Sequence, residues 1–210
     1  MDGYVRDPQE IYRRSFATIE RETDLGRFSL AMRAVALRLV HACGMTDLLD
    51  DLIFSEDAAE AGRNALKAGM PVFTDVEMVR AGITPSRLPA ANELICTLND
   101  PCARETGKAK GTTRSAAAVD LWDERLAGAV VAIGNAPTAL YRLLERLDEG
   151  CPKPALIVGM PVGFVGAAES KAELASNPRG VPFIAIAGRR GGSALAAAAV
   201  NGLCEKLERA

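Results

Sequence analysis

From residue 70 onward, short apolar runs alternate with amphipathic stretches. Five of these runs have the length of a strand and are rich in β-branched residues, and most end at a turn residue: MPVFTD, ELICTL, AVVAIG, ALIVGMP and VPFIAIAG. Four helical stretches lie between or after them: SAAAVDLWDERL, PTALYRLLERLDEG, AAESKAELASN and SALAAAAVNGLCEKLERA. This alternation predicts βαβ units. Because the runs are apolar throughout, it also predicts a parallel sheet with helices on both faces.

The first part of the chain, residues 8–69, has the pattern of helices. An Asp-Pro pair is typical of the start of the first helix. The segment FSLAMRAVALRLVHACG predicts a second helix that ends at Gly44, and SEDAAEAGRNALKAG predicts a third with Ser55 as its N-cap. Residues 99–113 are expected to form a long loop, a kind of segment that is often functional.

The composition is that of an ordinary globular protein. The chain has 210 residues, of which 49% are hydrophobic and 25% are charged, and this predicts a single domain over residues 1–210. The formal net charge of −2 offers no basic excess for a phosphate backbone, so nucleic acid is not an expected partner. No segment reaches the ~18 apolar residues of a membrane helix. The polar start MDGYVRDPQEIYRR has no signal-peptide core, so we expect a cytoplasmic location and no membrane partner.

The metal-ligating residue types are few and scattered. The chain has one histidine and no CxxC pair, which gives no spacing suited to zinc, so we expect no metal. We expect the thiols to be reduced and mostly buried. The five cysteines are Cys43, Cys96, Cys102, Cys151 and Cys204.

Three glycine-containing turns connect predicted strands to predicted helices, at residues 134–138, 159–166 and 188–193. In an open parallel sheet, ligands bind beyond the carboxyl ends of the strands, and helix N-termini suit anions. Each turn alone could be no more than a tight connection, but three at one edge favour an anionic ligand. The spacing fits neither the dinucleotide fingerprint nor the P-loop, which leaves a carboxylate or another non-nucleotide anion.

His41 is the one residue that titrates near pH 7 without special tuning. It lies near the end of a predicted apolar helix, where a hydrogen-bonded core histidine and a catalytic acid or base are both possible. No G-x-S-x-G turn is present for a triad. Cys43 lies two residues away, so on a helix it does not face the imidazole. The histidine chemistry that remains is that of a lone acid or base.

Several longer segments identify a family in combination: IYRRSFATI, VHACG, KAGMPVFTDVEMVRAGIT, TRSAAA, AIGNAPTAL, GMPVGFVGAAESK and GRRGGSALAAAA. With them the chain resembles the precorrin-8X methylmutases, or precorrin isomerases, of corrinoid biosynthesis, over nearly its whole length. The resemblance implies movement of a methyl group from C-11 to C-12 of precorrin-8X to give hydrogenobyrinate, with no cofactor. It also implies a homodimer with active sites near the subunit interface. The implied fold is α/β: three-layer and flavodoxin-like, with a mainly parallel five-stranded sheet, helices on both faces and preceding N-terminal helices.

The resemblance also assigns roles to four residues. His41, in VHACG, matches the family's proposed general acid, and a protonated imidazole could assist methyl migration by donating to a ring nitrogen. Ser15, Thr84 and Arg114 match substrate-binding positions. Arg114 suits a peripheral carboxylate of the tetrapyrrole. The two hydroxyls either donate to the ligand or cap a helix or turn.

Three other functions stay open at this point. A cobalt-precorrin-8 methylmutase would act on the cobalt-containing substrate, although the sequence resembles the metal-free enzymes more closely. A non-catalytic corrinoid carrier would bind the product and pass it on, and the presence of His41 argues against this. A flavodoxin-like module for a flavin would need aromatic side chains for stacking, and aromatic residues make up only 5% of the chain.

Overall fold

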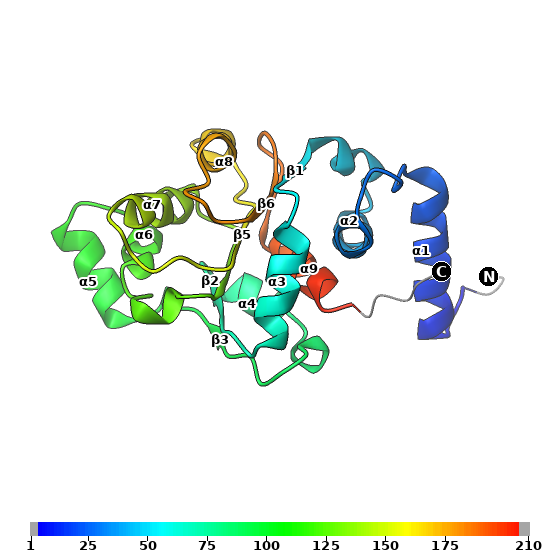
Figure 1. The fold of residues 1–210 in the computed structure, drawn as a ribbon, viewed down its shortest axis with the longest axis horizontal. Helices are drawn as coiled ribbons and strands as arrows, with labels where there is room; N and C mark the ends of the chain where they lie inside the picture. Colours follow the sequence, from blue (N-terminus) through cyan, green and yellow to red (C-terminus); the bar gives the residue numbers. More distant parts are fainter. Residues whose placement is uncertain (1–3, 206–210) are drawn as a thin grey trace.

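In the computed structural model, which describes residues 4–205, a twisted sheet lies between two layers of helices (Figure 1). Five strands are mutually parallel and stand in the order β3-β2-β4-β5-β6. They are β2 (Val72–Thr74), β3 (Leu94–Ile95), β4 (Val130–Ile133), β5 (Leu156–Gly159) and β6 (Phe183–Ile186). Numbered from β2, the order is 2-1-3-4-5, which is that of flavodoxin-like folds. The predicted fold class is confirmed.

A sixth strand, β1 (Leu52–Phe54), extends the sheet antiparallel to β6, so the predicted count of five strands is too low. It interrupts the segment predicted to be helical throughout. Three residues are too short to show a period, and this strand is specified by its pairing with a distant partner. Ser55 extends the contact between β1 and β6, because its hydroxyl accepts a hydrogen bond from the Phe183 N–H at 2.7 Å. It is therefore not the N-cap of the next helix, which is Asp57.

Helices cover both faces of the sheet. The face that contacts Val130 and Ala132 of β4 is covered by α3 (Ala58–Lys67), α4 (Glu77–Gly82) and α9 (Ser193–Leu203). The opposite face, with Val131 and Ile133, is covered by α6 (Arg114–Val119), α7 (Pro137–Asp148) and α8 (Ala167–Ser176). Alternate residues of one strand therefore enter two separate cores, as the apolar runs predict.

Residues 99–113, expected to be a loop, contain the helix α5 (Pro101–Ala109), which packs on α6. Asp100 caps it by accepting from the Cys102 N–H at 2.8 Å, and Pro101 occupies its first turn. Only Ala103 and Gly107 of this helix are buried, so its sequence shows almost no apolar period. The expectation of a loop is wrong for this reason.

The predicted helix over residues 115–126 is also shorter than expected. It consists of α6 and a separate 3₁₀ turn, η3 (Glu124–Leu126), divided where Asp123 adopts a positive φ of 40°. The last part of the predicted C-terminal helix, residues 206–210, lies outside the described residues.

The two N-terminal helices form a further tier outside α9. Helix α2 (Leu30–Cys43) packs on α9, and α1 (Pro8–Glu22) packs on α2, at the right of Figure 1. The backbones of α2 and α9 approach so closely that a Cβ on Gly202 would lie 2.7 Å from the Cα of Val35. The predicted cap Asp7 and the predicted end at Gly44, with φ of 69°, are both confirmed. The 3₁₀ turn η1 (Thr46–Asp51) follows and leads into β1.

All five cysteines are free thiols, but four are only part-buried and Cys102 is exposed, so the expectation of mostly buried thiols is too strong. Within residues 4–205, no helix is both long and apolar enough to cross a membrane. The same residues contain no group of three or more His, Cys, Asp or Glu side chains placed to hold a metal ion.

Candidate active site

His41 lies in the last turn of α2, against one face of α1. Its Nδ1 is 2.8 Å from the Oγ of Ser15. The rings of Tyr12 and Phe16 flank the imidazole, with centroid distances of 5.4 and 5.1 Å. Positions 12, 15 and 16 share one face of a helix, because residues three and four apart are neighbours on its surface. A single face of α1 therefore surrounds the histidine.

A cavity of about 270 Å³ opens beside His41, between α1, α2, the end of α4 and α9. Thr84 is among its lining residues, which also include Tyr12, Arg38, Ala42, Gly82, Arg87, Ala194, Ala197, Ala198 and Asn201. Small residues on α9 leave the space open. The structure thus brings His41 and Thr84 together in one cavity, with Ser15 directly behind the imidazole.

The backbone of Thr84 is fixed from α9. Its N–H donates to the Oδ1 of Asn201 at 2.9 Å, and the Nδ2 of Asn201 donates to the carbonyl of Gly82 at 2.9 Å. Thr84 precedes the 3₁₀ turn η2 (Pro85–Arg87), but its hydroxyl makes no capping bond to that turn. The side chain is therefore available to a ligand.

Two arginines give the cavity its charge. The Oε1 of Glu205 accepts from the Nε of Arg38 at 2.6 Å and from the Nη1 of Arg87 at 2.6 Å. Burial lowers the pKa of His41 below its ordinary value, and the positive charges of Arg38 and Arg87 lower it further. These effects favour the neutral form of the imidazole in the unliganded protein.

Arg114, in contrast, does not line this cavity. It is the exposed first residue of α6, on the opposite face of the sheet. Its neighbour Thr113 caps α6, and the Thr113 hydroxyl lies 2.8 Å from that of Thr138 at the start of α7. Of the four predicted site residues, Arg114 is the one that this structure leaves apart.

The turn at residues 134–138 lies at the carboxyl end of β4, as predicted, but its donors are already occupied. The carboxylate of Asp75 accepts from the N–H groups of Gly134, Asn135 and Ala136 at 2.8–2.9 Å. Burial raises the pKa of Asp75, and these N–H groups oppose that rise. The predicted anion site therefore holds the chain's own carboxylate at the point where strand order reverses, which argues against an external flavin or nucleotide there.

The turns at residues 159–166 and 188–193 pack tightly against each other. The N–H of Gly192 donates to the carbonyl of Met160 at 2.8 Å, and a Cβ on Gly191 would lie 2.4 Å from the same oxygen. Only glycine fits there. These turns support the start of α9, one wall of the His41 cavity.

Lys171 of α8 lies beneath these turns and is fully buried. Its Nζ donates to the carbonyl of Arg190 at 2.6 Å. The Arg190 guanidinium pairs with Asp51 and Asp47 of η1, which follows the helix of His41. Burial lowers the pKa of Lys171 to about 8, and the charge of Asp51 opposes this shift.

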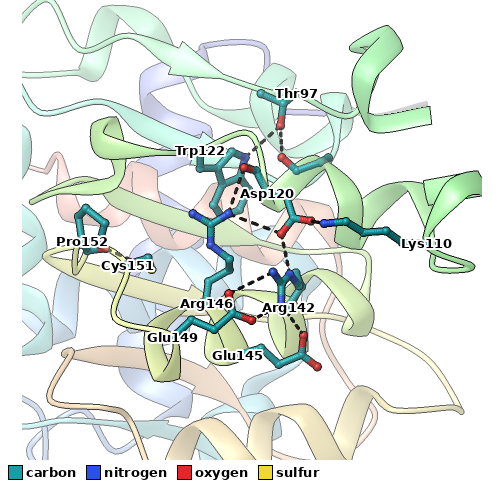
Figure 2. Close-up of polar contacts among 11 residues, drawn as sticks. Thr97, Lys110, Asp120, Trp122, Arg142, Glu145, Arg146, Glu149, Cys151 and Pro152 are labelled. Atoms are coloured by element: carbon teal, nitrogen blue, oxygen red, sulfur yellow. Dashed lines mark hydrogen bonds and ion pairs between the residues drawn. The ribbon is translucent and has the colours of Figure 1, made fainter. Parts of the chain in front are cut away.

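A separate ionic network joins α5, α6 and α7 on the other face of the sheet (Figure 2). Asp120 accepts from the Nε of Arg142 at 2.6 Å and from the Nζ of Lys110 at 2.9 Å. Burial alone would raise the pKa of Asp120, but these two cations hold it below its ordinary value. Arg142 also binds Glu145 and Glu149. The charges of this network satisfy one another, which indicates a structural role.

Sequence reasoning did not identify Tyr12, Arg38, Arg87 or Asn201 as parts of the cavity. Helical spacing could have found two of them, because Tyr12 is three residues before Ser15 and Arg38 is three residues before His41. Arg87 and Asn201 give no local signal, since they reach the cavity only through the tertiary fold.

The comparisons with known proteins agree with this architecture. A sequence profile of the family described as precorrin-8X methylmutase matches residues 10–206. The chain is 57% identical to the precorrin-8X methylmutase of Pseudomonas aeruginosa, covering 99% of this chain and 100% of that protein. It is 40% identical to the cobalt-precorrin-8 methylmutase of Salmonella typhimurium, covering 99% of each. The crystal structure of a precorrin-8X methylmutase from Thermus thermophilus superposes with a TM-score of 0.82 at 36% identity, covering 92% of this chain and 95% of that one.

Proposed function

The chain belongs to the precorrin-8X methylmutase family and is an isomerase of cobalamin biosynthesis, and from this premise we propose that His41 is the general acid in the conversion of precorrin-8X to hydrogenobyrinate. The bond from the methyl group to C-11 breaks as the bond to C-12 forms. Substrate and product are isomers, so the step needs no oxidant, reductant or second substrate. The observation that carries the proposal is the cavity that His41 lines together with Thr84.

The hydrogen bond to Ser15 sets the role of each imidazole nitrogen. Because Nδ1 contacts the Ser15 hydroxyl, Nε2 is left to face a ligand. A proton donated from Nε2 to a ring nitrogen makes the conjugated system poorer in electrons, which lowers the barrier to methyl migration. The rings of Tyr12 and Phe16 limit the access of water to the imidazole. Thr84 contributes a hydroxyl for hydrogen bonding to the substrate.

The cavity is small for a tetrapyrrole, since its volume of about 270 Å³ is below the ~300–1,000 Å³ usual for ligand pockets. The macrocycle must therefore extend over neighbouring surface. Exposed apolar side chains lie beyond the carboxyl ends of β2 and β5, including Met78 of α4 and Phe164, which are 67% and 84% exposed. We propose that a second copy of the chain covers them in a homodimer, and that Arg114 binds a substrate carboxylate outside the cavity.

Three further expectations have support of their own: the metal-free substrate, the cytoplasmic location and the single domain. The chain is 57% and 58% identical to two proteins named for precorrin-8X and 40% identical to one named for the cobalt form, which favours precorrin-8X. The five free thiols suit the reducing cytoplasm. One sheet, its two helix layers and the tier of α1 and α2 account for the described residues 4–205, which supports a single domain over residues 1–210.

The direct test mixes the purified protein with precorrin-8X, with no other addition, and follows the visible spectrum. We expect complete conversion to the spectrum of hydrogenobyrinate. A carrier would bind added hydrogenobyrinate but leave precorrin-8X unchanged, and that result would refute the proposal.

A further inference from the structure

The His41 cavity carries an unbalanced positive charge. Arg38 and Arg87 both line it, and both contact a single anion, the Glu205 carboxylate. The Arg38 guanidinium is fixed in place, because it lies 5.6 Å and 5.0 Å from the ring centroids of Tyr12 and Phe16. Two cations and one anion leave one positive charge in excess beside the imidazole.

No other ionised group among residues 4–205 lines the cavity to offset this charge. Helix α1 faces His41 with the Tyr12 phenol, the Ser15 hydroxyl and the Phe16 ring, none of which is a carboxylate or an amine. Helix α9 and the end of α4 contribute only residues that do not ionise: Gly82, Ala194, Ala197, Ala198 and Asn201. The charged lining of the cavity therefore consists of the two arginines.

The two guanidinium groups have donors to spare. Glu205 accepts from the Nε and Nη2 of Arg38 and from the Nη1 of Arg87. Among the described residues, the Nη1 of Arg38 and the Nε and Nη2 of Arg87 have no protein acceptor within hydrogen-bond distance. Planar forks of N–H donors match the geometry of a carboxylate. The arrangement fits a carboxylate-bearing ligand.

We propose that Arg38 and Arg87, held together by Glu205, bind one carboxylate of the substrate, and that this carboxylate supplies the negative charge under which His41 takes up its proton. The inference rests on the proposed function and adds to it a binding site and an order of events. Without that carboxylate, the neutral imidazole is favoured by burial and by the charges of the two arginines. A bound carboxylate offsets them, so the acid forms only once substrate is in place.

The single histidine makes this testable by proton NMR, because its C2 proton reports one titration. With hydrogenobyrinate as the probe, we expect binding to raise the pKa of His41 in the wild type. By linkage, the affinity for hydrogenobyrinate should then increase as pH falls through that range. An unchanged pKa in the complex would overturn the proposal.

Arg87 is the residue to change, because its side chain is 32% exposed, whereas that of Arg38 is only 11% exposed and supports the aromatic rings. In Arg87→Met we expect a higher pKa for His41 in the free protein and a smaller rise on binding. We also expect a loss of affinity of roughly 10- to 100-fold, the range for a charge-assisted hydrogen bond. Arg87→Lys should keep the pKa of free His41 low but recover the affinity only in part, because an ammonium lacks the fork.

Arg80→Met is the matched control, since it removes the same charge from an arginine that pairs with Glu77 on the surface of α4. If Arg80→Met changed the pKa of His41 and the affinity for hydrogenobyrinate as much as Arg87→Met does, the effect would come from net charge alone. That result would refute the carboxylate site. Thermal unfolding verifies that each variant is folded. The proposed function and the carboxylate site can fail separately. If His41→Ala converted precorrin-8X at the wild-type rate, His41 would not be the general acid. The affinities of the Arg87 variants for hydrogenobyrinate would still test the carboxylate site.

Discussion

At the scale of single residues, His41 shows how surrounding groups set the protonation of a side chain. Burial and two arginines favour the neutral imidazole in the free protein, which is the form that cannot donate a proton. Because the protonated form is the proposed donor, the isomerisation rate should fall as pH rises through the pKa of His41 in the substrate complex. The Ser15 hydroxyl fixes the ring without adding charge.

Arg114 is the residue whose role depends on groups outside the His41 cavity. Its side chain is exposed at the start of α6, so we expect its substitution to leave the fold intact. We expect Arg114→Ala to weaken hydrogenobyrinate binding by roughly 1.5–3 kcal/mol and Arg114→Lys to recover only part of this loss. Optical titration measures both. Unchanged affinity in the alanine variant would show that Arg114 does not contact the ligand.

At the scale of elements, the features that sequence predicts well are those set by near neighbours. The caps Asp7 and Gly44 act on their own helices, and both predictions are confirmed. Strand β1 depends on pairing with β6, whose residues lie 130–134 positions further along the chain, and so gives no local pattern. Helix α5 buries only two small residues, which is too few for a visible period. The same contrast holds in the site, where His41 was found because it is unique and Asn201 was missed because its partners are distant.

Lys171 connects elements from both faces of the sheet, since it holds the turn that joins Arg190 to the start of α9. Its pKa is about 8 in the folded protein against 10.5 for an ordinary lysine. Between these values the unfolded chain binds more protons, so this residue makes the free energy of unfolding increase with pH from about 8 to 10.5. We expect Lys171→Met to lose that increase.

Denaturant unfolding at pH 7 to 10 measures this effect, with Lys67→Met, an exposed lysine in the last turn of α3, as the control. Because the turn also supports the wall of the cavity, we expect weaker hydrogenobyrinate binding in Lys171→Met but not in Lys67→Met. If the free energy of unfolding changed with pH in the same way for Lys171→Met and the wild type, the lowered pKa of Lys171 would be contradicted.

At the scale of the whole molecule, the fold places the histidine away from the usual ligand crevice of a flavodoxin-like sheet. That crevice is closed by the chain's own Asp75, whereas the His41 cavity lies between α9 and the added N-terminal helices. The extra tier of α1 and α2 therefore creates this cavity, the proposed active site. The exposed apolar side chains that follow β2 and β5 are the basis of the proposed dimer.

We expect sedimentation at micromolar concentration to give about twice the 22.2 kDa mass of the chain. Phe164→Glu should shift the equilibrium towards the monomer, because it places a charge where the partner would bury an apolar ring. The control is Tyr4→Glu, because Tyr4 is an aromatic residue ahead of α1 that is 77% exposed, against 84% for Phe164. A wild-type mass near 22.2 kDa would remove the dimer from the account.

The central claim is that His41 donates the proton that assists methyl migration. Single-turnover visible spectra with precorrin-8X, recorded for wild type and His41→Ala across pH, test it most directly. We expect the variant to be slower by roughly 10²–10⁴-fold, the usual contribution of general acid catalysis. We also expect its rate to lose the decline with rising pH, while its affinity for hydrogenobyrinate changes little. A variant that reacts at the wild-type rate, or a wild-type rate that rises with pH through the same range, would contradict the claim.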